Sequence, residues 1–269
     1  MSDIVLSSAV RSNLLQLQST SDLISSTQTK LATGKRVNSA LDNPNNFFTA
    51  QGLDNRANDL NNLLDGMATG INTIQAANNG ITAITKLVQS AQSLVSQAQQ
   101  TSDAATKLSL STQFNAIRTQ IDQLSGDSGF NGTNLLAGAN LVVNLSETGS
   151  STTVSGVTDT ATGLSIAAAA NNWADSAAIT AASSDLTAAL STLRSQAQTL
   201  GSSLSTVQIR QDFTKATIST LQAGSASLTL ADSNQEGANL LALQTRQQLS
   251  TTALSLASQA DQNVLRLFR

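Results

Sequence analysis

The chain of 269 residues contains no cysteine and no histidine. Without cysteine it can form neither a disulfide bond nor a thiolate metal site. Without histidine it lacks the usual general base, the Ser-His-Asp triad and most zinc sites. Its acidic residues form no local constellation typical of paired-carboxylate hydrolases, and no Gly-x-Gly-x-x-Gly or Walker pattern is present. We therefore predict that the protein is not an enzyme and that it holds no metal and no cofactor.

Aromatic and charged residues are scarce, at 3% and 12% of the chain. The charged share is about half that of a typical soluble domain. A core made mainly of Leu, Ile, Val and Ala, without rings, suits narrow seams between helices. The net charge is −3 and the 14 basic residues are scattered, so we expect no nucleic-acid partner.

Long apolar runs are missing as well. No stretch approaches the ~20 apolar residues that span a membrane, so no membrane partner is expected. The first residues, MSDIVLSSAVRSNLL, lack a basic segment followed by an apolar run. This start predicts that no signal peptide is cleaved from the chain.

Proline occurs once, at Pro44, which leaves residues 45–269 free to form very long helices. Both before Pro44 and within residues 45–269, apolar residues recur at steps of three and four, which is the helical period. The run over 186–228 alternates these steps without a break for six heptads, as in a coiled coil. The runs with this period cover residues 6–31, 60–98, 110–124, 186–228 and 242–267.

Helix ends and turns are legible in the sequence. Gly34 is placed to end the first helix as a left-handed cap, and Asn43 with Pro44 predicts the start of the next. Asn131-Gly132 favours a tight turn. Residues 141–145 and 151–158 are rich in β-branched side chains, with Gly149 between them, so we expect one or two small hairpins.

These patterns predict a mainly α fold in which long antiparallel coiled-coil helices come from both chain ends, with a small β-hairpin-containing insert in the middle. We expect residues 60–98 beside 186–228, and 4–31 beside 240–267. The expected domains are an inner terminal helical hairpin of 1–42 plus 232–269, an outer helical core of 43–138 plus 185–231, and a short surface insert of 139–184.

Three segments resemble the bacterial flagellin family. Residues 31–53, LATGKRVNSALDNPNNFFTAQGL, resemble its N-terminal signature, in which a helix ends before an Asn-Ser-Ala-x-Asp loop. Residues 260–267 are similar to its Gln-Asn-Val-Leu ending, although Asp261 stands where proline usually precedes it. FNGTNLL at 130–136 resembles the turn after the second core helix. With its short middle, the chain resembles core-only flagellins of alphaproteobacteria.

The resemblance implies a structural subunit of the extracellular flagellar filament, exported unfolded by the flagellar type III route and polymerised into a helical tube for motility. The partners it implies are other copies of the chain in a helical homopolymer, the flagellar cap and junction proteins, and an export chaperone. Because the terminal seams are thin and contain Ser and Gln, we expect the termini to be disordered in the monomer and helical in the polymer.

Two sets of residues are candidates for roles in assembly. A loop between the first two helices is the candidate hinge. It contains Gly34, Asn38, Asp42 and Pro44. Apolar residues of the terminal runs are the candidates for packing between subunits. They are Leu6, Val10, Leu14, Leu17, Ile24, Leu249, Leu256, Val264, Leu265, Leu267 and Phe268.

Two alternatives share part of this pattern. A hook–filament junction protein has the same terminal helices, but the Asn-Ser-Ala-x-Asp loop and the Gln-Asn-Val-Leu ending favour flagellin. A secreted coiled-coil adhesin should carry a sticky apolar or charged central domain, and the insert of 139–184 is short and bland for that role.

Overall fold

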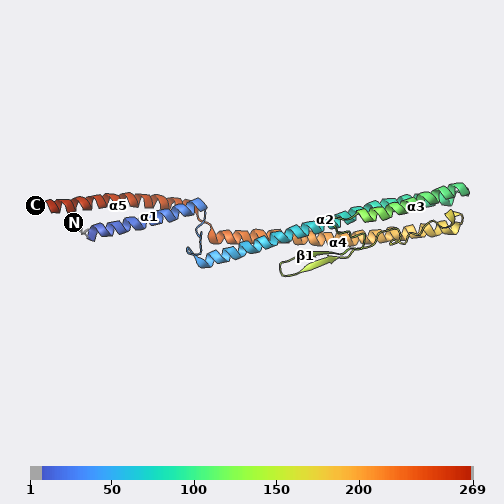
Figure 1. The fold of residues 1–269 in the computed structure, drawn as a ribbon, viewed down its shortest axis with the longest axis horizontal. Helices are drawn as coiled ribbons and strands as arrows, with labels where there is room; N and C mark the ends of the chain where they lie inside the picture. Colours follow the sequence, from blue (N-terminus) through green and yellow to red (C-terminus); the bar gives the residue numbers. More distant parts are fainter. Residues whose placement is uncertain (1–7, 268–269) are drawn as a thin grey trace. The chain divides into compact units, whose positions relative to one another are not determined.

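A computed structural model describes residues 8–267, and for residues 261 and 264–267 it describes the backbone alone. The fold is mainly α with one small antiparallel sheet, as predicted (Figure 1). The elements follow one another in this order: α1 (Ser8–Thr33), α2 (Pro44–Gln100), α3 (Ala104–Asp127), β1 (Leu141–Asn144), β2 (Ser151–Val154), the 3-10 turn η1 (Ala170–Trp173), α4 (Ser176–Thr229) and α5 (Ser233–Leu267).

Local capping chemistry fixes the helix boundaries. Gly34 follows the last residue of α1 with φ +66°, the left-handed conformation that closes a helix C-terminus. The Asn43 side chain accepts a hydrogen bond from the N–H of Asn46 at 3.0 Å, and Pro44 occupies the first position of α2. Both boundaries confirm the sequence prediction. Asp103 caps α3 in the same way by accepting from the N–H of Thr106 at 2.8 Å.

The chain divides into two compact units, and the division passes through α2 and α4. We call Met1–Arg56 with Thr220–Arg269 the terminal unit and Ala57–Ser219 the central unit. The division predicted from the sequence, into 1–42 plus 232–269, 43–138 plus 185–231, and 139–184, is a division by expected role in an assembly. The assignment of those ranges to inner and outer layers of an assembly stays a prediction.

The central unit is built around one hydrophobic core shared by α3, the C-terminal part of α2 and the N-terminal part of α4, which lie alongside one another (Figure 1). The apolar rows predicted over 60–98 and 186–228 contribute to this core from Met67 to Ala98 and from Leu186 to Val207, and α3 and the insert supply much of the rest. Its largest fully buried side chains include Met67, Phe114 and Leu186. Trp173 is also buried, with its ring centroid 5.0 Å from that of Phe114. Trp173 is the only tryptophan of the chain, so its fluorescence reports on this unit.

The insert between α3 and α4 contains the predicted hairpin. β1 and β2 pair antiparallel, with Val143 opposite Thr152, and Gly149 turns the chain with φ +93°. The strands alternate in burial, because Val143 and Val154 face the core while Val142 is exposed. The hairpin thus covers part of the core of the central unit with one face.

Between β2 and α4, polar side chains of α3 form hydrogen bonds with the backbone of residues 161–169. Asp122 Oδ1 accepts from the N–H of Ala161 at 2.7 Å, and Arg118 Nε donates to the carbonyl of Ile166 at 2.9 Å. Asn115 Oδ1 accepts from the N–H of Ala169 at 3.1 Å. These three residues are spaced by three and four along α3, so they lie on one face of the helix. They fix an irregular segment that would otherwise leave backbone groups without partners.

Candidate assembly site

The two linkers of the terminal unit pair with each other. One linker, residues 34–43, joins α1 to α2, and the other, residues 230–232, joins α4 to α5. Lys35 forms an antiparallel bridge with Leu230, and the N–H of Ala231 donates to the carbonyl of Gly34 at 3.0 Å. The N–H of Arg36 donates to the carbonyl of Thr229 at 2.7 Å. The linkers are therefore a defined structure held by backbone hydrogen bonds, which the sequence analysis did not predict.

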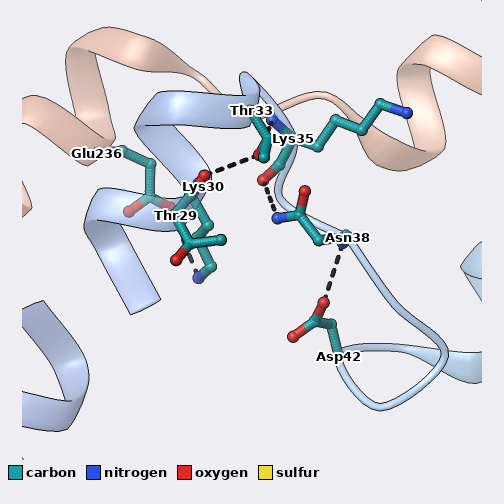
Figure 2. Close-up of polar contacts among 7 residues, drawn as sticks. All are labelled: Thr29, Lys30, Thr33, Lys35, Asn38, Asp42 and Glu236. Atoms are coloured by element: carbon teal, nitrogen blue, oxygen red, sulfur yellow. Dashed lines mark hydrogen bonds and ion pairs between the residues drawn. The ribbon is translucent and has the colours of Figure 1, made fainter. Parts of the chain in front are cut away.

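Asp42 organises the rest of the first linker. Its Oδ2 accepts from the N–H groups of Asn38 and Ser39, each at 2.9 Å, and from Ser39 Oγ at 3.2 Å. Asn38 also donates from Nδ2 to the carbonyl of Lys35 at 3.0 Å, so it connects the carboxylate to the paired linkers (Figure 2). The backbone N–H groups of Ser39 and Asn38 hold the pKa of Asp42 below its usual value of 3.8.

The structure thus gathers three of the four candidate hinge residues, Gly34, Asn38 and Asp42, in one hydrogen-bonded loop, with Pro44 at its far end. Whether the loop acts as a hinge stays a prediction. Arg36 is a residue that the sequence analysis missed: its Nη2 donates to the carbonyl of Leu228 at 3.2 Å, across to the end of α4. Its basic side chain next to a helix C-terminus was the only available signal.

An ion pair joins the last turn of α1 to the first turn of α5. Lys30 Nζ lies 3.9 Å from Glu236 Oε1, with the two side chains 29% and 14% exposed (Figure 2). Each charge also complements the dipole of its own helix end. Asp232 caps α5 by accepting from the N–H groups of Asn234 and Gln235 at 2.9 and 3.2 Å. The start of α5 is therefore fixed both to its own cap and to α1.

Beyond this pair, α1 and α5 contact each other along a thin seam (Figure 1). The buried residues of α1 are Val10, Thr20 and Thr27, so two of its three buried positions are polar. Leu17 and Ile24 are half-buried between them. None of the described side chains of α5 is fully buried. The seam thus provides little apolar burial for its length.

Three faces can be distinguished on α5. The less exposed residues recur at steps of three and four, as expected for the face turned towards α1, and Leu243 lines a groove with Leu23 and Thr27 of α1. They are Leu240, Leu243, Gln247, Ser250, Leu254 and Ala257. A second row is apolar and exposed. It consists of Ala242, Leu249, Ala253, Leu256 and Ala260, and we call it the outer stripe. The remaining face carries polar residues such as Gln248 and Ser255.

The candidate packing residues fall into three groups. Val10 is buried and Leu17 and Ile24 are half-buried, so they belong to the contact between α1 and α5. Leu14, Leu249 and Leu256 are 46%, 67% and 62% exposed. Val264, Leu265 and Leu267 belong to α5, but their side chains lie outside the description, as do Leu6 and Phe268 altogether.

Among the described side chains of residues 8–267, no group of three His, Cys, Asp or Glu residues lies close enough together to hold a metal ion. Of the helices in that range, none is long and apolar enough to cross a membrane. The most prominent features of the terminal unit are therefore its paired linkers and the outer stripe.

Comparison with known proteins gives matches over nearly the whole chain. Residues 4–141 match the family model described as bacterial flagellin N-terminal helical region, and residues 184–268 match the bacterial flagellin C-terminal helical region. The chain is 32% identical to flagellin FljN of Caulobacter vibrioides over 95% of this chain and 94% of that protein. It is 29% identical to a flagellin of Brucella melitensis over the full length of both.

A solved structure, the crystal structure of Bacillus cereus flagellin, also matches. It shares 20% sequence identity with this chain, and the match covers 57% of this chain and 88% of that one, with a TM-score of 0.48.

Proposed function

The chain belongs to the bacterial flagellin family and is a structural subunit of the extracellular flagellar filament, and from this premise we propose how its terminal unit drives assembly. Copies of the chain pack against one another through the outer stripe of α5. The same contact supplies the apolar burial that the seam between α1 and α5 lacks. Folding of the two terminal helices is thereby coupled to entry into the polymer.

The observation that carries this proposal is the second apolar face of α5. A lone exposed leucine is unremarkable on any protein surface. Here Leu249 and Leu256 lie one heptad apart, with the small Ala253 between them on the same face, which is the spacing of a helix-packing seam. Inside one molecule α1 lies against the less exposed face of α5, and of the stripe residues only Ala242 is among those lining the described groove with α1. A neighbouring subunit of a homopolymer is the simplest occupant for the stripe, because family membership already requires self-assembly.

The finer parts of this function remain part of the proposal. We expect the chain to pass unfolded through the flagellar type III channel and to be carried by an export chaperone. Cap and junction proteins are its other expected partners. Flagellins are a structural protein family, and we propose that this chain likewise carries no catalytic activity.

Leu256→Asp tests the outer stripe. A charge at this position has to be buried without a partner when the stripe is covered, which is strongly unfavourable. We expect the variant to form no filaments in electron microscopy and sedimentation assays at concentrations where the wild-type chain polymerises. The central unit should remain folded, as shown by an unchanged fluorescence maximum of the buried Trp173.

Ser255→Asp is the matched control, because Ser255 precedes Leu256 but lies on the polar face of α5. It introduces the same charge in the same turn, and we expect normal polymerisation. Wild-type polymerisation of Leu256→Asp would contradict the proposal, and so would equal loss of filaments in both variants.

A further inference from the structure

Asp159 is a fully buried carboxyl group with no hydrogen-bond partner on either oxygen. Its exposed fraction is 0%, and neither Oδ1 nor Oδ2 meets a donor among the described residues. The Oε1 atom of Gln196 on α4 is likewise buried and unpartnered. Gln196 lies close enough to this carboxyl to influence its pKa. Three orphaned oxygens, in two neighbouring side chains, therefore need an explanation.

Asp159 cannot simply turn towards solvent, because its backbone is fixed on both sides. Its own N–H donates to the carbonyl of Leu136 at 2.9 Å. Two residues further on, the N–H of Ala161 donates to Asp122 at 2.7 Å. The neighbours Ala161 and Leu164 are themselves buried in the core. The side chain therefore stays in the interior of the central unit.

No nearby charge compensates an ionised Asp159. On α3, Arg118 and Asp122 bind the backbone of Ile166 and Ala161, and on α4, Asp185 accepts from the N–H of Ala167. Other charged side chains of the surrounding elements, Lys86 of α2, Arg194 of α4 and Glu147 of the insert, are exposed. Burial raises the pKa of Asp159, and the neighbouring Gln196 side chain partly opposes that rise.

We propose that Asp159 carries a proton in the folded chain and forms a two-bond ring with the amide of Gln196. A carboxylic acid donates its O–H to Gln196 Oε1 while its carbonyl oxygen accepts from the Gln196 Nε2–H. One proton thus gives a partner to all three orphaned oxygens. An ionised carboxylate has no donor to offer, so Oε1 would remain unsatisfied and the negative charge would stay buried without a counter-charge.

The ring makes the folded central unit a proton-binding site that is sensitive to alkali. The pKa of Asp159 is raised in the folded chain, so between its unfolded and folded pKa values the folded state holds one proton more than the unfolded state. Stability therefore falls as pH rises through this window. Since the ring joins the segment after β2 to α4, loss of the proton should loosen that segment first. This inference does not depend on how subunits pack.

The wild-type chain can be tested directly by infrared spectroscopy. At pH 7 carboxyl groups with ordinary pKa values are ionised, so a protonated carboxyl carbonyl band at this pH identifies a strongly raised group. We expect one such band at pH 7, its loss at alkaline pH, and its absence in Asp159→Asn. The lack of the band in the wild-type chain at pH 7 would overturn the proposal, because an ionised Asp159 bridged by water gives no such band.

Urea unfolding followed by Trp173 fluorescence gives the second readout. The chain has no histidine and no cysteine, so few other groups titrate between pH 5.5 and 9. We expect the wild-type unfolding equilibrium constant to rise by up to about tenfold per pH unit within the window. Asp159→Asn can form a neutral amide–amide ring with Gln196, so its unfolding should show a much weaker pH dependence.

Asp65→Asn is the control, because Asp65 is an exposed aspartate of α2 in the same unit. It should keep the wild-type pH dependence and the infrared band. If Asp159→Asn fails to fold, Gln196→Met provides a second variant: loss of the amide should shift the carboxyl band of the wild-type spectrum. An unshifted band in Gln196→Met, or equal pH dependence in Asp159→Asn and the wild-type chain, would contradict the ring.

Discussion

At the scale of single residues, Asp42 shows how one carboxylate oxygen can order a whole loop. Its Oδ2 receives two backbone N–H groups and one hydroxyl, all from the two residues Asn38 and Ser39. The backbone N–H of Ser39 is the largest cause of its lowered pKa, followed by that of Asn38. A lowered pKa means that the ionised form is favoured by folding. The stabilisation is present above the ordinary value of 3.8 and is lost as pH falls through the lowered value.

Replacement of Asp42 by Asn should therefore weaken the loop at neutral pH. Asn keeps an acceptor oxygen but loses the charge that strengthens these hydrogen bonds. We expect several-fold faster hydrogen–deuterium exchange at the amides of Asn38 and Ser39, and no further response to acid below pH 4. Asp54→Asn, a change at an exposed aspartate of α2, should leave this exchange unaffected. Equal protection in Asp42→Asn and the wild-type chain at pH 7 would show that the charge is dispensable.

Gly80 is a second residue whose identity is dictated by its surroundings. A Cβ atom added there would lie 2.6 Å from Leu136 Cδ1 and would overlap Ser128 Oγ. Gly66, also inside α2, has no atom within 4 Å of the corresponding position. Glycine inside a helix is otherwise unfavourable by about 0.5–1 kcal/mol relative to alanine. Gly80 therefore allows the chain after α3 to approach α2 closely.

We expect Gly80→Ala to destabilise the central unit by about 1–3 kcal/mol through overpacking. Gly66→Ala should stabilise the same helix by about 0.5–1 kcal/mol, since nothing obstructs the added methyl group. Urea unfolding monitored by Trp173 fluorescence measures both changes. The two substitutions are chemically identical, so effects of the same sign would refute the assigned contact.

At the scale of helices and strands, the sequence predicted most of the central unit. The heptad rows over 60–98 and 186–228 are buried where the pattern placed them, and the caps at Gly34 and Asn43 were correct. The paired linkers were not predictable, because their hydrogen bonds join backbone groups far apart in the chain. Asp159 escaped detection for a related reason: its neighbours in sequence are polar and small, and only tertiary packing buries it.

The terminal helices show why periodicity alone can select the wrong face. In α1 the predicted row included Val10, which is buried, but also Leu14, which is 46% exposed, and it missed the buried Thr20 and Thr27. In α5 the regular apolar row proved to be the outer stripe, while the face towards α1 includes Gln247 and Ser250. Hydrophobic periodicity identifies an apolar face, but it cannot tell a contact within one molecule from a contact between molecules.

The polar seam of α1 yields a prediction for this pair of helices. The hydroxyl of Thr20 donates to the carbonyl of Gln16 at 2.8 Å within its own helix, so it contributes no bond to α5. Valine has nearly the same shape and buries a methyl group in place of the hydroxyl. We expect Thr20→Val with Thr27→Val to stabilise the contact between α1 and α5 by about 1 kcal/mol per site.

Far-UV circular dichroism of the unpolymerised chain should then show more helix, and protease cleavage after Lys30 should slow. Thr29→Val is the control, because Thr29 is exposed in the same helix and its hydroxyl also bonds to the backbone four residues earlier. A similar gain of helix in the control would show that valine raises the helix content through its intrinsic propensity and not through burial in the contact between α1 and α5.

At the scale of the whole molecule, the terminal and central units differ in how far each can hold itself together. The central unit contains nearly all fully buried large side chains, including Trp173 and Phe114. In the terminal helices, α1 of 26 residues buries one apolar side chain, Val10. Burial of one such side chain contributes about 1.5–3 kcal/mol, whereas ordering the backbone opposes folding by about 1–2 kcal/mol for every residue. The central unit should therefore fold alone, and the terminal helices should depend on neighbours.

Limited trypsin digestion of monomer and filament tests this difference. In the monomer we expect rapid cleavage after Lys30 and Arg246, which lie in α1 and α5, and slow cleavage after Lys86 and Arg194 of the central unit. All four sites have accessible side chains or lie at the edge of the seam, so cleavage rates should reflect opening of the backbone. In the filament the two terminal sites should become resistant by at least tenfold while the central sites change little, since only the terminal helices gain their missing burial from neighbouring subunits. Monomer that retains both terminal helices under conditions that cut Lys86 would contradict the coupling of folding to assembly, because it would show that the seam between α1 and α5 is sufficient without a second copy.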